Sequence, residues 1–321
     1  MIVDAHTDVL HFVGEDFELV LRRGEGGAFQ RYWLQSLLAG GVGVQICPVY
    51  GEGARQSDAR ERTLDQVAEF NHVVEANAER VYHCQTRADL DDARLRLVLA
   101  MEGAEPLEGD PDAFDEWYER GVRSVSLTWN HPNDFAGGID TPTQGLTDRG
   151  RALVRRFDEL GVMLDLAHAS AQTWRDVAEE DVSFSVTHAN CRELCDHPRN
   201  LADWQLELLG EREGVLGMMA LSFVVAPDAP TVWRWLDHFD HAVAVMGIEH
   251  VGIGADFVDQ VVPTAGARSA ARTRVALDRF TAPEHFPFLV SALRERGYDG
   301  EELEGILGGN WLRILEAALP A

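Results

Sequence analysis

Eight short apolar runs, separated by helix-like segments, constrain the fold of this chain more than any other feature. The runs cover residues 2–6, 44–50, 97–102, 122–129, 162–168, 183–188, 215–221 and 251–256. They are rich in Val, Ile and Leu and are continuously hydrophobic, as strands buried on both faces of a parallel sheet require. Amphipathic segments typical of helices lie between them at 60–80, 113–120, 148–160 and 231–246. This alternation over eight strands predicts an α/β protein with a closed (β/α)8 barrel of the TIM type.

The alternation continues from one end of the chain to the other. Its 321 residues suit one barrel, which typically needs about 250 residues plus insertions. No shift in composition, internal repeat or low-complexity linker interrupts the pattern. We therefore expect residues 1–321 to form a single catalytic barrel domain. The helix expected over 148–160 also has Thr147 as a candidate N-cap and Gly161 as its stop signal.

The charge balance of the chain is strongly acidic. Asp and Glu number 54 against 28 Lys plus Arg, all 28 of them Arg, so the net charge is -26. Such a surface repels phosphate backbones and anionic lipid headgroups, which argues against nucleic acid or a membrane as a partner. Small neutral or zwitterionic substrates fit better. The lysine-free composition is compatible both with adaptation to high salt and with a GC-rich genome, and the sequence leaves these two origins open.

Neither the cysteines nor the N-terminus indicates export. Four scattered cysteines, Cys47, Cys84, Cys191 and Cys195, do not form the pattern of a disulfide framework, so we expect free thiols. The first residues, MIVDAHTD, have neither the basic nor the apolar region of a signal peptide. No stretch approaches the roughly 20 apolar residues of a membrane span. These features favour a cytoplasmic protein.

Residues that could bind a metal ion or a substrate stand where most of the runs end. In barrels of this type the active site forms at the carboxyl ends of the strands. The residues that end the runs include His6, Glu102, Trp129, His168, His188 and Asp256. A single histidine in such a place is more often structural, but several on one rim indicate a metal site.

Four of these residues, together with Asp8, form a ligand set that suits zinc. His6 and Asp8 in DAHTD are alternate residues on one face of a strand, so both can reach one ion. Glu102 ends a buried run, where a carboxylate is costly unless it is paired or bound to metal. With His168 and His188, the chain offers three histidines and two carboxylates. This set suffices for two zinc ions that share one bridging carboxylate.

Motifs along the whole chain resemble those of the membrane dipeptidase (renal dipeptidase) family of zinc metallopeptidases, which are amidohydrolase-like barrels. In order, the motifs are DAHTD, MEG, SLTWN, GLTDRGRALVRRFDELGVMLDLAHAS, VTHAN, HPRNL, HVGIGADF and LGGNWLRI. The resemblance implies a binuclear zinc dipeptidase that hydrolyses the amide bond of a dipeptide, including L-Xaa-D-Xaa dipeptides, with a zinc-bridging hydroxide. It also implies a homodimer.

The resemblance assigns a role to each of the five ligands. His6 and Asp8 would bind the first zinc, His168 and His188 would bind the second, and Glu102 would bridge both ions together with the hydroxide. Many related binuclear barrels bridge their metals with a carbamylated lysine. Because this chain has no lysine, a carboxylate bridge is required.

Two further roles follow from the resemblance. Arg199 in HPRN would bind the C-terminal carboxylate of the substrate, a task that suits a planar bidentate donor. Asp256 in GIGADF would carry a proton from the bridging hydroxide to the leaving amine. Two alternatives stay open, since Arg199 could be a surface residue at a helix start and Asp256 could orient a ligand histidine. Asp165 is expected to be a structural or supporting residue.

The chain departs from the family pattern in two places. Trp129 stands where the family often has a histidine that helps bind the substrate, and His131 follows two positions later. We keep Trp129 and His131 as candidate substrate-binding residues in an altered pocket. After GIGADF, Val258 and Asp259 replace the usual Asp-Gly, which predicts a reshaped pocket loop.

Two other functions remain as alternatives. One is a different metal-dependent hydrolase of the same barrel type, acting on a lactone, a phosphoester or an N-acyl amino acid. The pairing of His6 with Asp8, rather than a His-X-His motif, speaks against it. The other is an inactive zinc-binding scaffold, which the retention of all five ligands with Arg199 and Asp256 opposes.

Overall fold

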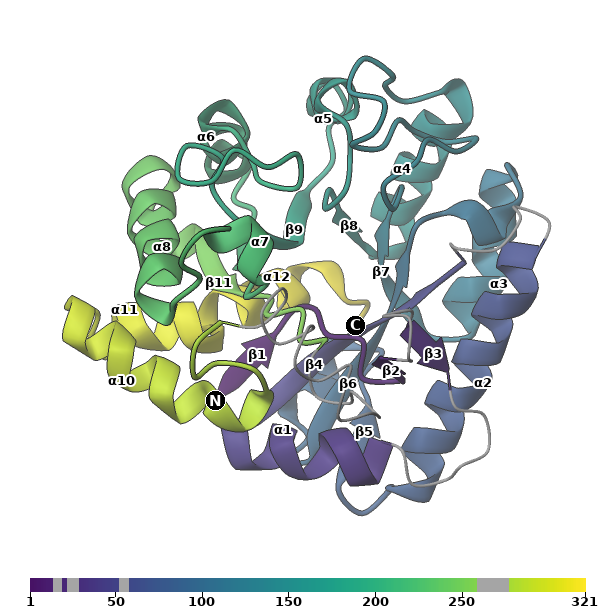
Figure 1. The fold of residues 1–321 in the computed structure, drawn as a ribbon. Helices are drawn as coiled ribbons and strands as arrows, with labels where there is room; N and C mark the ends of the chain where they lie inside the picture. Colours follow the sequence, from purple (N-terminus) through teal and green to yellow (C-terminus); the bar gives the residue numbers. More distant parts are fainter. Residues whose placement is uncertain (14–18, 22–28, 52–57, 259–276) are drawn as a thin grey trace.

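A closed barrel of eight parallel strands lies at the centre of the protein (Figure 1). The computed structural model describes residues 1–13, 19–21, 29–51, 58–258 and 277–321. The barrel strands are β1 (Ile2–Asp4), β4 (Val42–Tyr50), β6 (Leu95–Glu102), β7 (Val122–Ser126), β8 (Met163–Asp165), β9 (Phe184–Ala189), β10 (Leu216–Met218) and β11 (Val251–Ile253). Their order is β4-β1-β11-β10-β9-β8-β7-β6, and the pairing of β6 with β4 closes the ring. The predicted (β/α)8 fold is confirmed.

Among the described residues, three further short strands lie outside this ring. Strand β5 (Val81–His83) pairs in parallel with the beginning of β6, and β2 (His11–Val13) forms an antiparallel pair with β3 (Leu19–Leu21). None of the three was predicted from the sequence. Each has three residues, too few for hydrophobic periodicity to distinguish a strand from a loop.

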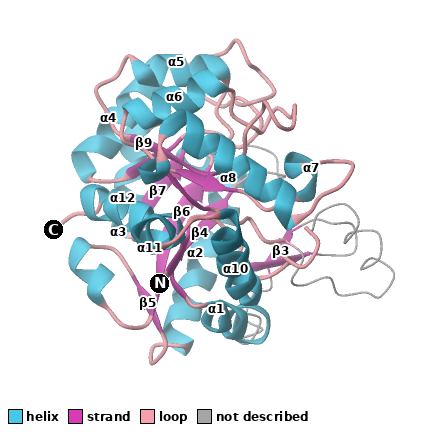
Figure 2. Cartoon of the chain, turned by 90° about the vertical axis from the view of Figure 1, so that its left-hand side faces the viewer, coloured by secondary structure: helices cyan, strands magenta, loops and turns pink. Residues whose placement is uncertain are grey.

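The helices surround the barrel, as the view in Figure 2 also shows. They are α1 (Gln35–Gly40), α2 (Ala59–Ala76), α3 (Phe114–Glu119), α4 (Asp148–Leu160), α5 (Ala171–Ala178), α6 (Asp203–Glu211), α7 (Ser222–Val225), α8 (Val232–Met246), α10 (Phe286–Arg296), α11 (Gly300–Glu304) and α12 (Asn310–Ala318). The four predicted helices correspond to α2, α3, α4 and α8, although α2 ends four residues earlier than expected. Thr147 caps α4 by accepting the N–H of Gly150 at 3.1 Å, and Gly161 ends it with φ 69°.

The apolar core has two layers that differ in position. The larger layer packs the outer faces of the strands against the helices. The smaller one fills the barrel interior with side chains such as Val3, Val44 and Val98, and it includes Trp311 and Leu315 from α12. Helix α12 therefore closes the amino end of the barrel. The carboxyl end is left for polar side chains.

The functional candidates lie at or just beyond the ends of the strands. Strand β8 ends at Asp165, and His168 three residues later has φ 63°. Strand β11 ends at Ile253, and Asp256 three residues later has φ 53°. These left-handed turns make both strands shorter than the predicted apolar runs, and they direct the following side chains over the barrel. Within the described part of the chain, we find no helix with the length and apolar character needed to cross a membrane.

Candidate metal centre and substrate site

The five predicted metal ligands lie together at the carboxyl end of the barrel. His6 and Asp8 follow β1, Glu102 is the last residue of β6, His168 follows β8, and His188 lies in β9. All five side chains are buried. Along β6, Glu102 shares the inward-facing positions of Val98 and Ala100, so strand alternation places its carboxylate inside the ring.

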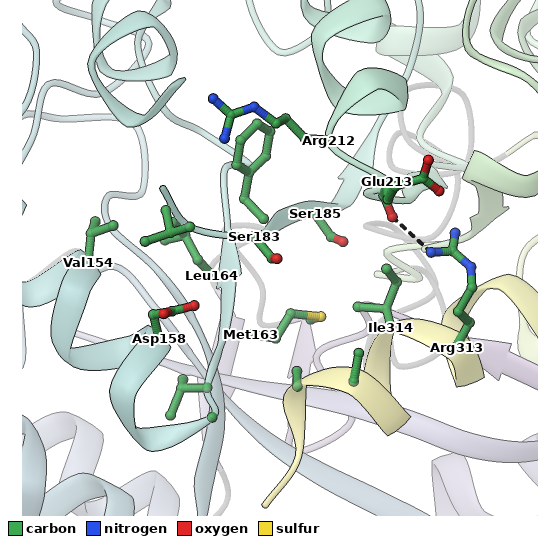
Figure 3. Close-up of a pocket in the computed structure, with 16 residues that line it drawn as sticks. Val154, Asp158, Met163, Leu164, Ser183, Ser185, Arg212, Glu213, Arg313 and Ile314 are labelled. Carbon is green, nitrogen blue, oxygen red and sulfur yellow. Dashed lines mark hydrogen bonds between the residues drawn. The ribbon is translucent and has the colours of Figure 1, made fainter. Parts of the chain in front are cut away.

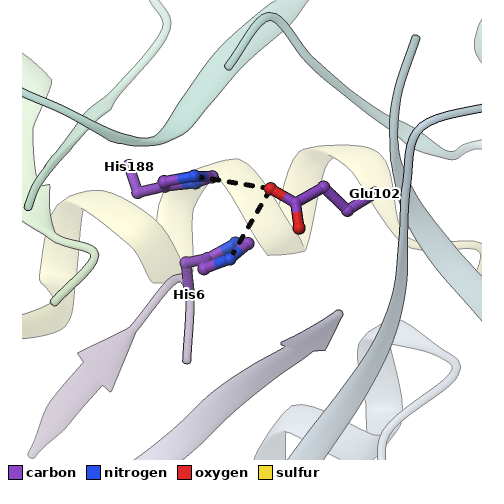
Figure 4. Close-up of side chains that lie close together, drawn as sticks. All are labelled: His6, Glu102 and His188. Carbon is purple, nitrogen blue, oxygen red and sulfur yellow. Dashed lines mark ion pairs between the residues drawn. The ribbon is translucent and has the colours of Figure 1, made fainter. Parts of the chain in front are cut away.

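The Glu102 carboxylate is the centre of this group. Its Oε1 atom lies 3.0 Å from Nε2 of His168, 3.5 Å from Nε2 of His188 and 3.8 Å from Nε2 of His6. Figure 4 shows the His188 ring above the His6 ring, with one nitrogen of each ring directed toward Glu102. The two rings are stacked, with centroids 3.7 Å apart. Side chains from β1, β6, β8 and β9 thus converge on one point.

Hydrogen bonding fixes the proton position on His188. The Thr187 hydroxyl donates its only hydrogen to Oδ2 of Asp165 at 2.5 Å, so it must accept a hydrogen from Nδ1 of His188 at 2.9 Å. Asp165 is held by the N–H groups of Ala167 at 2.8 Å and Thr187 at 3.0 Å. Nε2 of His188 therefore has a free lone pair, and Asp165 has the supporting role expected of it.

The same logic applies to His168. Its Nδ1 lies 2.8 Å from Oδ1 of Asn130, an oxygen that can only accept, so Nδ1 carries the hydrogen. The Nε2 atoms of His168 and His188 are then both unprotonated, yet they lie 3.0 Å apart and both face Oε1 of Glu102. Three lone-pair donors repel one another at these distances unless a metal ion, or a proton on Glu102, lies among them.

Unsatisfied atoms give an independent test of this fit. Oε1 of Glu102 and Oδ1 of Asp8 are buried and have no hydrogen-bond partner. Ligand atoms lie within 4.8 Å of one another in two groups, His6–Glu102–His188 and His6–Asp8–Asp256. Buried polar atoms are rarely left without partners, and a metal ion would satisfy both. The donor set of imidazoles and carboxylates fits zinc.

Burial also sets the charge state of the ligands. It lowers the pKa of His6 to about 3, helped by the nearby Arg199, and it lowers the pKa values of His168 and His188 well below the usual value. All three histidines are therefore neutral, as metal ligands must be. Burial raises the pKa of Glu102 well above its usual value, and a bound cation would oppose that effect.

Asp256 lies on the loop after β11, close to Asp8. Its N–H donates to the carbonyl of His6 at 2.8 Å, which joins this loop to the DAHTD segment. Asp4 makes the same connection, accepting from the N–H of Ala255 at 2.8 Å and from the hydroxyl of Thr7 at 2.7 Å. Burial raises the pKa of Asp256 to about 7, while Arg199 opposes the shift. Asp256 can therefore both accept and donate a proton near neutral pH.

Arg199 is a buried cation with spare hydrogen-bonding capacity. Its side chain is 8% exposed, and its Nη2 donates to the carbonyl of His188 at 3.3 Å. No carboxylate among the described residues forms an ion pair with it. Burying a guanidinium without a partner is costly, so a ligand carboxylate is the natural complement. The surface position that we had kept as an alternative for Arg199 is wrong.

The two other candidate residues differ in position. Trp129 is partly buried and stacks on His168, with ring centroids 5.6 Å apart. The His131 side chain is 67% exposed and pairs with Asp140 at 2.8 Å, outside the buried ligand group. Its role in substrate binding stays a prediction. Val258 packs with Met219, Leu221 and Val224, whereas Asp259 lies outside the described residues.

Sequence reasoning did not identify Asn130 and Thr187 as residues that orient the ligand histidines. Thr187 directly precedes His188, and Asn130 directly follows Trp129. A polar neighbour of a ligand is a weak signal, because its hydrogen-bond partner depends on the folded structure. In this site, both residues present Nε2 of a histidine to the same point.

The family model of membrane dipeptidases (peptidase family M19) matches residues 1–320 of this chain. The chain belongs to this family. An uncharacterized protein in the pqqA 5′ region of Klebsiella pneumoniae is 31% identical over 78% of this chain and 94% of its own length. Dipeptidase 3 of Mus musculus is 30% identical over 98% of this chain but 63% of its own length. This chain therefore spans less than two thirds of that relative.

A solved structure supports the same fold. A metallo peptidase from Rhodobacter sphaeroides, liganded with a phosphinate mimic of the dipeptide L-Ala-D-Ala, superposes with a TM-score of 0.84 at 24% identity. The superposition covers 99% of each chain. Family membership confirms the predicted resemblance and the predicted class of enzyme, a metal-dependent hydrolase of peptide bonds.

Proposed function

We propose that this protein is a dipeptidase that works with two zinc ions, held by His6, Asp8, Glu102, His168 and His188, with Glu102 as the bridge. The observation that carries the proposal is the convergence of Nε2 of His168, Nε2 of His188 and Oε1 of Glu102 on one buried point. The dipeptidase relatives, and the dipeptide mimic in the Rhodobacter sphaeroides structure, support a dipeptide as substrate.

Zinc ions bound here would lower the pKa of a water molecule and polarise the scissile carbonyl group. The protein supplies binding and orientation. Arg199 pairs with the substrate's C-terminal carboxylate, which a dipeptide always has within one residue of its single peptide bond. This pairing therefore fixes which bond lies at the metal site, the bond that precedes the C-terminal residue.

Asp256 transfers the proton. Its carboxylate accepts a proton from the attacking water as the new carbon–oxygen bond forms. It then donates that proton to the amide nitrogen, and the carbon–nitrogen bond breaks to release an amine. The group must be easily protonated and easily deprotonated, and burial moves the pKa of Asp256 from its usual value toward neutrality.

The test is release of free amino acids from a panel of L,L and L,D dipeptides. The zinc-loaded protein is compared with a chelator-stripped sample at low and at high salt. We expect release that depends on zinc and that falls sharply when the C-terminal carboxylate is replaced by an amide. No release by a folded, zinc-loaded protein would refute the proposal. Equal release from free-acid and amide substrates would refute the role of Arg199.

A further inference from the structure

A cavity of about 250 Å³ lies directly beside the metal site. His168 and Arg199 contribute to its lining, so it opens onto the position expected for a substrate. The other side chains that matter here are Arg192 and Asp196, from the loop after β9, and Gln205 from α6. A space of this size can accommodate one amino-acid side chain.

Arg192 has donor capacity that the protein does not use. Its Nη2 donates to the carbonyl of Pro198 at 2.9 Å, but its Nε is buried and has no partner. No carboxylate of the described residues forms an ion pair with it. A buried guanidinium nitrogen without an acceptor is unfavourable. Nη1 also donates no hydrogen bond to a described residue, so a ligand oxygen in the cavity would give this guanidinium a further acceptor.

The cavity is lined by positively charged side chains, although the molecule as a whole is negatively charged. The chain has a net charge of -26, yet this cavity presents the two guanidinium groups of Arg192 and Arg199. The acidic residue in the lining, Asp196, is exposed and forms no ion pair with either arginine. Gln205 accepts the N–H of Ala202 through Oε1 at 3.0 Å, which leaves its Nε2 as a further donor. These donors suit an anion better than an apolar or cationic group.

We propose that Arg192 selects dipeptides whose C-terminal residue has an acidic side chain, aspartate or glutamate. This inference rests on the proposed function, in which Arg199 binds the main-chain carboxylate of the same residue. One cavity would then hold both carboxylates of that residue, each facing its own arginine. A planar guanidinium forms paired hydrogen bonds to a carboxylate that a neutral carboxamide cannot reproduce.

The test compares aspartate with asparagine, which has the same shape but no charge. We would measure kcat/KM of the zinc-loaded full chain for Ala-Asp and Ala-Asn, in the L,L and L,D series. We expect at least one series to favour Asp by about tenfold, the size of one charge-assisted hydrogen bond. In Arg192→Gln this Asp/Asn ratio should fall to about one, mainly through KM, and Arg192→Lys should give an intermediate ratio.

A matched variant controls for loss of a positive charge. Arg155→Gln, at a side chain 62% exposed on α4, should keep the wild-type ratio. Arg192 could instead only brace its loop through Pro198. Arg192→Gln would then weaken both substrates equally, and an unchanged ratio would overturn the inference.

Two further outcomes separate this inference from the proposed function. Hydrolysis of neutral dipeptides with no preference for Asp would overturn the inference and leave the proposed function intact. No hydrolysis of any dipeptide would overturn both. If Arg192→Gln does not fold, Arg192→Lys alone decides, and a wild-type ratio in that variant would contradict the role of the guanidinium fork.

Discussion

The two ends of the barrel contain cavities of similar size but different chemistry. The cavity at the amino end measures about 210 Å³ and is lined by apolar side chains, by Ser183 and Ser185, and by charged residues of both signs (Figure 3). The charged residues are Asp158, Arg212, Glu213 and Arg313. Arg313 donates to the carbonyls of Glu213 and Glu249, both at 2.9 Å, and Arg212 also donates to two backbone carbonyls. Each arginine of this end thus joins two segments of the backbone.

At the carboxyl end the polar groups have unused bonding capacity. Arg199 lacks a carboxylate partner, and Glu102 and Asp8 each have a buried oxygen without a hydrogen bond. Backbone conformation alone would not separate the two ends, because Glu213 at the amino end also has a positive φ, of 56°. Trp311 at the amino end also has a buried indole nitrogen without a partner. The reactive end is therefore distinguished by buried carboxylate oxygens without hydrogen bonds, rather than by cavity size or by unsatisfied atoms of any kind.

The largest effect should come from removing the shared ligand. Glu102→Gln should lower kcat/KM by about 10⁴, because the several kcal/mol of transition-state stabilisation supplied by bound metal is lost. Zinc content should fall with it. The matched change at the amino end, Arg313→Gln, should leave activity unchanged. Full activity in Glu102→Gln, or loss of activity in Arg313→Gln, would contradict the assignment of the carboxyl end as the reactive end of the barrel.

Asp256→Asn should lower kcat by about 10³, the usual scale of a lost general acid–base group. Zinc content, measured by elemental analysis, should stay the same. Surviving turnover would rule out Asp256 as the proton carrier. Loss of one zinc would instead make Asp256 a ligand, as its position near His6 and Asp8 would allow.

Thr187→Val removes the hydroxyl group between Asp165 and His188. Zinc affinity should weaken about 10–100-fold, because the ring is no longer held in the tautomer that presents Nε2. Thr63→Val is the control, since Thr63 is buried on α2 and donates only to the carbonyl of Ala59. Competition with a chromophoric chelator measures both affinities. Equal affinities would show that the hydroxyl does not orient His188.

Zinc affinity should rise with increasing pH. Burial raises the pKa values of Asp8 and Glu102 well above their usual values in the metal-free protein, and that of Asp256 to about 7. Protonated carboxyls must lose their protons to bind metal, so affinity should rise from pH 6 to pH 8, by about tenfold per pH unit for each proton released. Calorimetry in two buffers of different ionisation enthalpy would count those protons. An affinity independent of pH would contradict the assignment of buried carboxyls as ligands.

Much of the fold could be predicted because its signals are local. The eight strands follow from continuous apolar runs, and the ends of α4 follow from Thr147 and Gly161. The ends of β8 and β11 could not be placed, because His168 and Asp256 adopt left-handed conformations that propensity does not favour. The closeness of the five candidate ligands could be predicted because strand ends on one rim must converge, and their roles as ligands stay a prediction.

The supporting residues could not be identified in the same way. The roles of Asn130 and Thr187 each depend on the direction of one hydrogen bond. The role of Arg192 depends on a guanidinium nitrogen that donates no hydrogen bond. Such properties depend on side chains from different strands and loops meeting in space. The cytoplasmic location, the homodimer and the extent of the single domain stay predictions.

The central claim is that two metal ions lie at the carboxyl end of the barrel and share Glu102. Anomalous diffraction at the zinc edge, from crystals of the zinc-loaded protein, tests it most directly. We expect two peaks beside the Glu102 carboxylate, one near His6 and Asp8 and the other near His168 and His188. No peak at this rim in a zinc-loaded crystal, or a peak only in the amino-end cavity, would contradict it.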